Sequence, residues 1–265
     1  MLKKVMLITP PYHCGVVESA GRWPNLGFVY LAGELRAAGY EVMIYDAMSL
    51  FVDYPEIEAK IREWQPDVVG STAFTATIND AVKVLGVAKK VNPETVTLVG
   101  GVHPTFCYDE IFAGDGDKVD YCILGEGEYT LPELLDAVFS GADLTQVQGI
   151  AYQQEGRVVR TENRPFIEDL DALRPAWDLI DWNDYPLYFI KDAHVALVNS
   201  SRGCIHECSF CSQHKFWQGT YRERDPVKFC DEIEHLFTEY GVDVFFVADE
   251  YPTRDAERWE RFSIS

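Results

Sequence analysis

The stretch TVTLVGG at residues 95–101 is a short apolar run, rich in β-branched residues, that ends in two glycines. Runs of this length that end in turn-forming residues are typical of buried β-strands. Four similar runs lie in the first 140 residues: KVMLIT at 4–9, EVMIYDA at 41–47, DVVGSTA at 67–73 and YCILGEGE at 121–128. Because nearly continuous apolar strands need cover on both faces, the five runs predict a parallel sheet between layers of helices.

Helical patterns separate these strands. LGFVYLAGELRAAG at 26–39 ends in a glycine suited to a helix C-cap, and TINDAVKVLGVAKKV at 77–91 repeats apolar residues three and four positions apart. The alternation predicts an α/β fold for residues 1–140, a doubly wound, Rossmann-like parallel sheet of five strands. Ligands of such sheets bind beyond the carboxyl ends of the strands.

Small, hydroxyl and acidic residues, with one histidine, follow three of the predicted strands. They are Ser71, Thr72 and Thr75 after the third strand, Gly100, Gly101 and His103 after the fourth, and Gly125, Glu126, Gly127 and Glu128 after the fifth. Glycine lets a ligand approach the backbone closely, although a glycine also simply makes turns. Together, at one edge of one sheet, these residues favour a binding site for a large flat ligand.

The chain changes character after residue 140. GIAYQQEGRVVRT at 149–161 predicts a small hairpin that turns at Glu155-Gly156, and residues 141–192 as a whole read as an ordered linker. A new strand–helix series follows in residues 193–265. It consists of a strand at HVALVNSS (194–201), an amphipathic helix at DPVKFCDEIEHLFTEYG (225–241) and a strand at VDVFFVADE (242–250).

Composition excludes several classes of function. The net charge of −20 argues against nucleic acid as a partner, because that binding depends on Lys and Arg neutralising phosphates. The N-terminus does not read as an export signal, and no run approaches the twenty apolar residues of a membrane span, so we expect a cytoplasmic protein. Seven cysteines in such a chain argue against a disulfide framework.

Three of the cysteines gather in SRGCIHECSFCSQHKFW at residues 201–217, whereas Cys14, Cys107, Cys122 and Cys230 are scattered and are expected to be small buried apolar residues. Cys204, Cys208 and Cys211 offer three thiolates within eight residues. A structural zinc site needs a fourth ligand, which His206 or His214 could supply. An iron–sulfur cluster with one open iron uses three cysteines, and the position between a parallel strand and a helix favours this alternative.

The spacing C-x3-C-x2-C, with Phe210 before the last cysteine, resembles the radical S-adenosylmethionine (SAM) superfamily. The first 140 residues, with VGGVHPT and GEGE, resemble the cobalamin-binding domain that precedes the radical core in one of its subfamilies. Within that group, residues 10–41 and 201–226 are similar to the anaerobic magnesium-protoporphyrin IX monomethyl ester oxidative cyclases. The resemblance covers essentially the whole chain.

The resemblance implies three cofactors. Cys204, Cys208 and Cys211 would bind three irons of a [4Fe–4S] cluster, and SAM would chelate the fourth iron and be cleaved to methionine and a 5′-deoxyadenosyl radical. Phe210 would lie near the adenine of SAM, and Asp249 and Glu250 would contact its amino group. Cobalamin would occupy the strand-end residues named above. The substrate would be a tetrapyrrole of bacteriochlorophyll biosynthesis, and the electron donor a protein such as a flavodoxin or ferredoxin.

One motif of many cobalamin domains is missing. The string D-x-H-x-x-G, which supplies a histidine to cobalt, does not occur, and the nearest string is PYHCG at 11–15. We therefore expect bound cobalamin to lack a protein histidine ligand. His13 and His103 are then either polar contacts beside the corrin ring or ordinary loop histidines.

Three functions compete. The leading hypothesis is cobalamin-dependent radical closure of a porphyrin ring; a radical methyltransferase would use the same cofactors, and a non-catalytic binding fragment is the third. Residues 193–265 leave room for about two strand–helix units of roughly thirty residues, the first units of a partial barrel, whereas the resemblance implies a partial barrel of six. We therefore expect a truncated N-terminal part of a radical SAM core, with one open sheet edge, that does not convert a porphyrin by itself.

Overall fold

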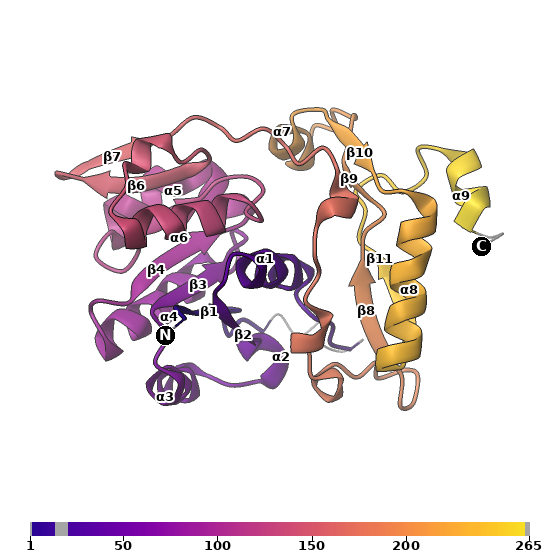
Figure 1. Ribbon diagram of the computed structural model, residues 1–265, viewed down its shortest axis with the longest axis horizontal. Coiled ribbons are helices and arrows are strands. Elements are labelled where there is room, and N and C mark those ends of the chain that lie inside the picture. Colours follow the sequence, from indigo (N-terminus) through magenta and orange to yellow (C-terminus); the bar gives the residue numbers. More distant parts are fainter. Residues whose placement is uncertain (1, 14–20, 263–265) are drawn as a thin grey trace. The chain divides into compact units, whose positions relative to one another are not determined.

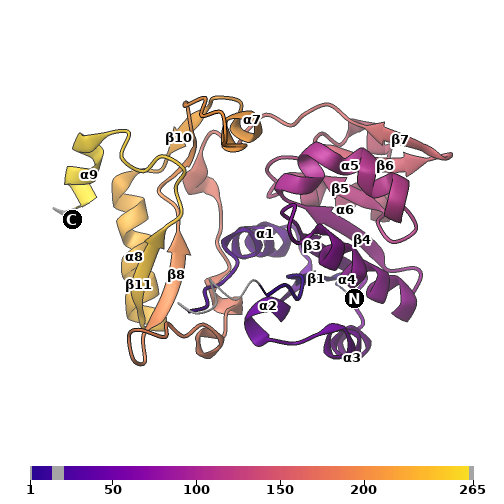
Figure 2. The same ribbon diagram turned by 180° about the vertical axis from the view of Figure 1, so that it is seen from behind.

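The computed structural model describes residues 2–13 and 21–262, and the contacts within it divide the chain into two units. The first unit contains the chain up to His13 and residues Gly27–Phe166. The second contains the segment that ends at Leu26 and the chain from Ile167 onward. Figures 1 and 2 show the elements of each unit from opposite sides.

The first unit is built on a seven-stranded sheet with the order β2-β1-β3-β4-β5-β6-β7. Its strands are β1 (Lys4–Ile8), β2 (Glu41–Tyr45), β3 (Val68–Thr72), β4 (Val96–Gly100), β5 (Tyr121–Ile123), β6 (Ile150–Gln154) and β7 (Arg157–Arg160). The first five pair in parallel, so the predicted α/β fold is confirmed. The strand order reverses direction between β1 and β3, which is where doubly wound sheets bind ligands.

Helices cover both faces of this sheet, as its apolar strands require (Figure 1). They are α1 (Leu26–Ala37), α2 (Ala47–Leu50), α3 (Tyr54–Trp64), α4 (Ile78–Val91), α5 (Val102–Asp115) and α6 (Thr130–Ser140), with a 3-10 turn η1 at Leu144–Gln146. Apolar residues of α3, α4 and α5 pack with those of the strands in one core on one face. Leu85 of α4 is fully buried there, as the periodicity of residues 77–91 predicts.

The hairpin β6–β7, expected within a linker, completes the first unit's sheet. β6 pairs antiparallel with β5, so the two strands extend the five parallel ones rather than standing apart. Glu155 and Gly156 both have positive φ, 51° and 75°, which is the backbone of a two-residue hairpin turn. Local turn residues predicted the hairpin, whereas its attachment to β5 depends on a pairing distant in sequence.

The second unit contains a strand–helix–strand arrangement and the cysteine loop. Its elements are η2 (Leu170–Ala172), η3 (Trp177–Leu179), η4 (Trp182–Asp184), β8 (His194–Val198), β9 (Ser201–Gly203), α7 (Gln213–Trp217), β10 (Tyr221–Glu223), α8 (Pro226–Tyr240), β11 (Val242–Val247) and α9 (Ala256–Phe262). β8 and β11 pair in parallel, and β9 and β10 pair antiparallel on either side of the loop. The Asp225 side chain caps α8 by accepting hydrogen bonds from two backbone amides of its first turn.

A short segment from early in the chain also belongs to the second unit. Gly21 forms a β-bridge with Leu187, and the Arg22 amide donates to the Pro186 carbonyl at 3.1 Å. The Trp23 ring meets the Phe246 ring edge-on, with 5.8 Å between centroids. Residues 21–26 therefore contribute packing to a unit whose other residues follow more than 140 positions later.

The scattered cysteines differ in burial. Cys122 on β5 is fully buried, as predicted, and burial raises the pKa of its thiol to about 12. Cys107 and Cys230 are only partly buried, so the prediction that they are buried is wrong, and Cys14 lies outside the described residues. In the described part of the chain, no helix has the length and apolarity that crossing a bilayer requires.

Candidate functional site

Thr105 joins the ends of two strands in the first unit. Its hydroxyl donates to the Gly101 carbonyl at 2.7 Å and accepts from the Gly125 amide at 3.0 Å, which links the carboxyl ends of β4 and β5. The sequence prediction included both glycines but missed Thr105, although it stands in the quoted string VGGVHPT. The predicted strand-end residues of β4 and β5 are thus brought together by a residue on α5.

The residues predicted after β3 and β4 have different roles. Ser71 is buried, and its hydroxyl donates to the Ile8 carbonyl at 2.8 Å, so it holds β3 to β1 rather than facing a ligand. Thr75 is exposed, and its hydroxyl lies 3.3 Å from the Nδ1 atom of His103. A β-carbon on Gly101 would lie 2.8 Å from the Ala73 carbonyl oxygen and 3.0 Å from the Thr72 hydroxyl. Close packing of β3 against β4 therefore explains Gly101.

The last group of predicted residues follows β5. Gly125 has a φ of +75°, and a β-carbon there would meet no atom within 4 Å, so its surroundings are open. Gly100 and Gly127 are partly buried, and Glu126 and Glu128 are buried with contacts inside the protein. The two glutamates are thus better placed to stabilise the turn after β5 than to contact a ligand at the surface.

Exposed aromatic residues surround the carboxyl edge of the sheet. Each follows the end of a different strand: Phe51 after β2, Phe74 after β3, Phe106 after β4 and Tyr129 after β5. The His13 ring stacks on the Phe51 ring with 4.8 Å between centroids and 4° between planes. Exposed large apolar side chains that follow the strands of one sheet make its carboxyl edge a candidate binding surface. Sequence reasoning missed these four aromatics because it considered only small and polar residues there.

The cysteine loop of the second unit presents three free thiols. Cys208 is exposed, Cys204 and Cys211 are half-buried, and the Cys211 amide donates to the Cys208 carbonyl at 3.0 Å, so these two cysteines share one turn. Phe210, between them, is 91% exposed. At the base of the loop, Gly203 of β9 pairs with Tyr221 of β10. The φ of Gly203 is +100°, and a β-carbon there would lie 2.2 Å from the Thr220 carbonyl oxygen.

The loop offers thiols, which are donors that zinc ions and iron–sulfur clusters both use. Among the residues that the structure describes, no three His, Cys, Asp or Glu side chains stand together as ligands of one metal ion. Three free thiols on one loop fit the donor set of a four-iron cluster with one open iron, since each thiolate there binds a different iron.

Asp249 anchors the chain just before the loop. Its Oδ1 atom accepts from the Ser200 amide at 2.8 Å, and its Oδ2 atom accepts from the hydroxyls of Ser200 and Ser201, both at 2.6 Å. Arg258 of α9 donates to the Ser200 carbonyl at 2.5 Å and to its hydroxyl at 3.1 Å. Ser200, Ser201 and Arg258 are buried, so the hydroxyls and the two terminal guanidinium nitrogens find their partners inside the protein.

Glu250, the neighbour of Asp249, contacts two points around the loop. Its Oε2 atom accepts from the Gly203 amide at 3.0 Å, and its Oε1 atom accepts from the Trp217 indole nitrogen at 2.9 Å. Both acids were predicted as contacts of SAM, and the structure gives both carboxylates partners inside the protein. Ser200, Arg258 and Trp217 were not predicted, because nothing local in the sequence links them to residues 249–250.

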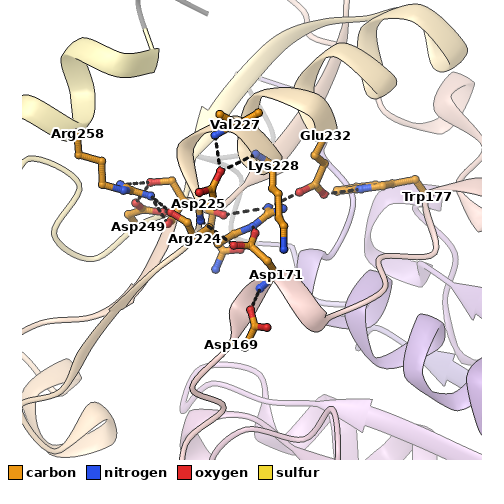
Figure 3. Close-up of polar contacts among 12 residues, drawn as sticks. Asp169, Asp171, Trp177, Arg224, Asp225, Val227, Lys228, Glu232, Asp249 and Arg258 are labelled. Carbon is orange, nitrogen blue, oxygen red and sulfur yellow. Dashed lines mark hydrogen bonds and ion pairs between the residues drawn. The ribbon is translucent and has the colours of Figure 1, made fainter.

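A second buried charge network holds the segment that follows residue 166 (Figure 3). Arg224 donates to Asp171 at 2.8 Å and pairs with Glu232 of α8, and all three side chains are about nine-tenths buried. Glu232 also accepts from the Trp177 indole nitrogen at 2.8 Å, and Asp171 accepts from the Asp225 amide at 2.6 Å. Buried charges are tolerated when they are paired in this way. The network fixes η2 and η3 against the start of α8.

The chain that carries these two candidate sites is similar to known proteins. Residues 12–135 match the family model of the B12 binding domain, and most of them lie in the first unit. The resemblance of the chain to the cobalamin-binding radical SAM enzymes is confirmed by its relatives.

Among these relatives, the anaerobic magnesium-protoporphyrin IX monomethyl ester cyclase of Rubrivivax gelatinosus is 43% identical over 98% of this chain, which spans 47% of that protein. An uncharacterized methyltransferase of Pyrococcus horikoshii is 31% identical over 94% of this chain and 54% of its own length. The cobalamin-dependent SAM radical enzyme OxsB shares the fold, with a TM-score of 0.76 and 23% identity over 94% of this chain and 34% of OxsB. The chain thus spans about half the length of the curated relatives it matches.

Two glycine substitutions separate backbone strain from crowding at the strand ends. Gly125→Ala is expected to cost about 1–2 kcal/mol in unfolding free energy, because only the positive φ opposes the new β-carbon. Gly101→Ala is expected to cost clearly more, because its β-carbon also meets the Ala73 carbonyl. Denaturant unfolding of both variants measures the difference. Equal costs would show that the close approach of β3 and β4 is not what requires Gly101.

Proposed function

We propose that this chain carries the cobalamin-binding domain and the cluster loop of an enzyme of the anaerobic magnesium-protoporphyrin IX monomethyl ester cyclase type. The observation that carries the proposal is the loop of three free cysteines, which follows β8 and the short strand β9, in the same chain as the match to the B12 binding domain. Identity of 43% with a cyclase, over almost the whole chain, supports this reaction over methyl transfer. The tetrapyrrole substrate and the activity of the whole protein are parts of the proposal.

In this proposal Cys204, Cys208 and Cys211 hold three irons of a [4Fe–4S] cluster, and the fourth iron is left for SAM. A bound cluster would supply single electrons, which thiol and carboxylate side chains cannot do. Cys208 is exposed, Cys204 and Cys211 are half-buried, and all three thiols are free to bind iron. A protein such as a flavodoxin or ferredoxin would supply the electron.

The protein's own side chains would orient SAM around the loop. Phe210 presents an almost fully exposed ring, and stacking against adenine would bury apolar area of that ring. A carboxylate offers about four lone-pair sites. Because two of these on Glu250 are used by Gly203 and Trp217, others stay available to accept from the amino group of SAM. Asp249 would act beside it, with its position fixed by Ser200 and Ser201.

Cobalamin, in the proposal, lies on the carboxyl edge of the first unit's sheet. The exposed rings of Phe74 and Phe106 offer apolar contact to the corrin, and the open backbone at Gly125 lets it approach. Thr75 and His103 would be polar contacts near its rim. The Nδ1 atom of His103 lies 3.3 Å from the Thr75 hydroxyl, so these two polar groups stand together. The missing D-x-H-x-x-G string is what supports a role for this histidine other than a ligand of cobalt.

The first prediction from this proposal concerns iron. After anaerobic reconstitution with iron and sulfide, the chain is expected to contain about four irons and to show the electron paramagnetic resonance spectrum of a reduced [4Fe–4S] cluster that changes when SAM is added. Cys208→Ala should abolish the cluster, and Cys230→Ala, a matched change on α8 outside the loop, should leave it intact. Stoichiometric zinc without iron uptake would contradict the proposal.

The second prediction concerns cobalamin. The chain is expected to bind cobalamin with no histidine on cobalt, so His13→Ala and His103→Ala should leave the visible absorption of bound cobalamin unchanged. Each substitution should weaken binding by no more than about tenfold, the loss of one polar contact. A shift from a nitrogen-coordinated to a water-coordinated spectrum in either variant would show that this histidine is a ligand.

The third prediction separates ring closure from methyl transfer. With reductant, cobalamin, magnesium-protoporphyrin IX monomethyl ester and methyl-labelled SAM, a full-length enzyme that contains this sequence is expected to leave the label in methionine, because ring closure adds no carbon. The 265-residue chain by itself is expected to form no ring-closed product. Chromatography of the labelled products measures this. Label on the tetrapyrrole would support a methyltransferase, which is the function named for the relative from Pyrococcus horikoshii.

A further inference from the structure

The two ends of the cysteine loop meet at one place. Gly203 stands directly before Cys204, and the chain returns through α7 to Tyr221, its partner across β9 and β10. Only three residues pair in this short antiparallel ladder, which by itself is a weak closure. The separation of the three thiols therefore depends on what else holds the loop's base.

Glu250 supplies that additional closure. One carboxylate oxygen accepts from the backbone amide of Gly203, before the first cysteine, and the other accepts from the Trp217 indole, after the last cysteine. Trp217 is itself fixed, since it is buried and the Arg222 guanidinium lies 5.3 Å from its ring centre. A single charged group thus connects the two sides of the loop.

We propose that Glu250 is a positioning residue that closes the cysteine loop and sets the separation of its thiols. The role of the loop in binding a cluster rests on the proposed function, whereas the closure itself does not. The two hydrogen bonds end on different carboxylate oxygens, and glutamine would replace one of these acceptors with a donor nitrogen. Hydrogen bonds to a charged acceptor are among the strong ones, and both donors would be left without an acceptor if Glu250 were removed.

The test is hydrogen exchange in the cluster-free 265-residue chain. Glu250→Gln and Trp217→Phe should each speed the exchange of residues 204–217 by about tenfold or more, the effect of losing a charged hydrogen bond. Glu239→Gln, an exposed glutamate on the same unit, controls for loss of charge. Trp182→Phe controls for loss of a buried indole, since the described structure gives that indole nitrogen no acceptor.

The double variant distinguishes a bridge from two separate effects. If Glu250 and Trp217 act through one hydrogen bond, the fold increase in exchange rate of the double variant should be smaller than the product of the fold increases of the two single variants. If Trp217→Phe leaves residues 204–217 unchanged, Glu250 does not bridge the loop and the proposal is wrong. If exchange speeds equally in α4 of the first unit, the effect is global and the proposal is also wrong.

A second measurement relates closure to the cluster. In reconstituted protein, Glu250→Gln and Trp217→Phe should both lose iron to a chelator about tenfold faster than Trp182→Phe, and both should alter the resonance spectrum of the reduced cluster. If Glu250→Gln changes the resonance spectrum and the rate of iron loss but Trp217→Phe changes neither, Glu250 acts as a contact of SAM and does not close the loop. If no variant and no parent protein takes up iron, the proposed function fails, and the exchange experiment still decides on the closure.

Discussion

Parallel strands of one sheet place their carboxyl ends at one edge, and both units of this protein depend on that constraint. In the first unit it gathers the ends of β3, β4 and β5, with Thr105 joining Gly101 to Gly125. In the second unit, the register of β8 and β11 pairs Val198 with Val247. Ser200 and Asp249 each follow two residues later, which is why the carboxylate reaches the serine. One geometric rule thus produces both an apolar binding surface and a polar anchor.

The sequence was sufficient for features that depend on local pattern. The five parallel strands, helices α1, α4 and α8, and the turn at Glu155-Gly156 follow from apolar periodicity, caps and turn residues. The three cysteines were recognisable because their spacing is itself the signal. Among the predicted strand-end residues, sequence could say which edge they share but not which way they face, and Ser71 turned out to be buried in the sheet.

The remaining features depend on partners distant in sequence. Arg224 contacts Asp171 from 53 positions away, and Arg258 contacts Ser200 from 58. No periodicity encodes such pairs, and a buried arginine looks in sequence like any surface arginine. The acids at 249 and 250 illustrate the same limit, since their location at a strand end was predictable but their hydrogen-bond donors were not. The exposed aromatics Phe51, Phe74, Phe106 and Tyr129 are different, because they too follow strand ends and an apolar residue there looks in sequence like part of the core.

Residues 21–26 give the second unit a part that precedes almost all of the first unit in the chain. On the ribosome, the first unit can complete its sheet once residue 160 has emerged, whereas Gly21 and Trp23 must await Leu187 and Phe246. Formation of the second unit is therefore a late event of high contact order. The same contacts limit how the protein can be divided into fragments. A piece that begins at residue 167 would lack the β-bridge of Gly21 and expose the face of Phe246 that Trp23 covers, so the second unit is not separable by a single cut.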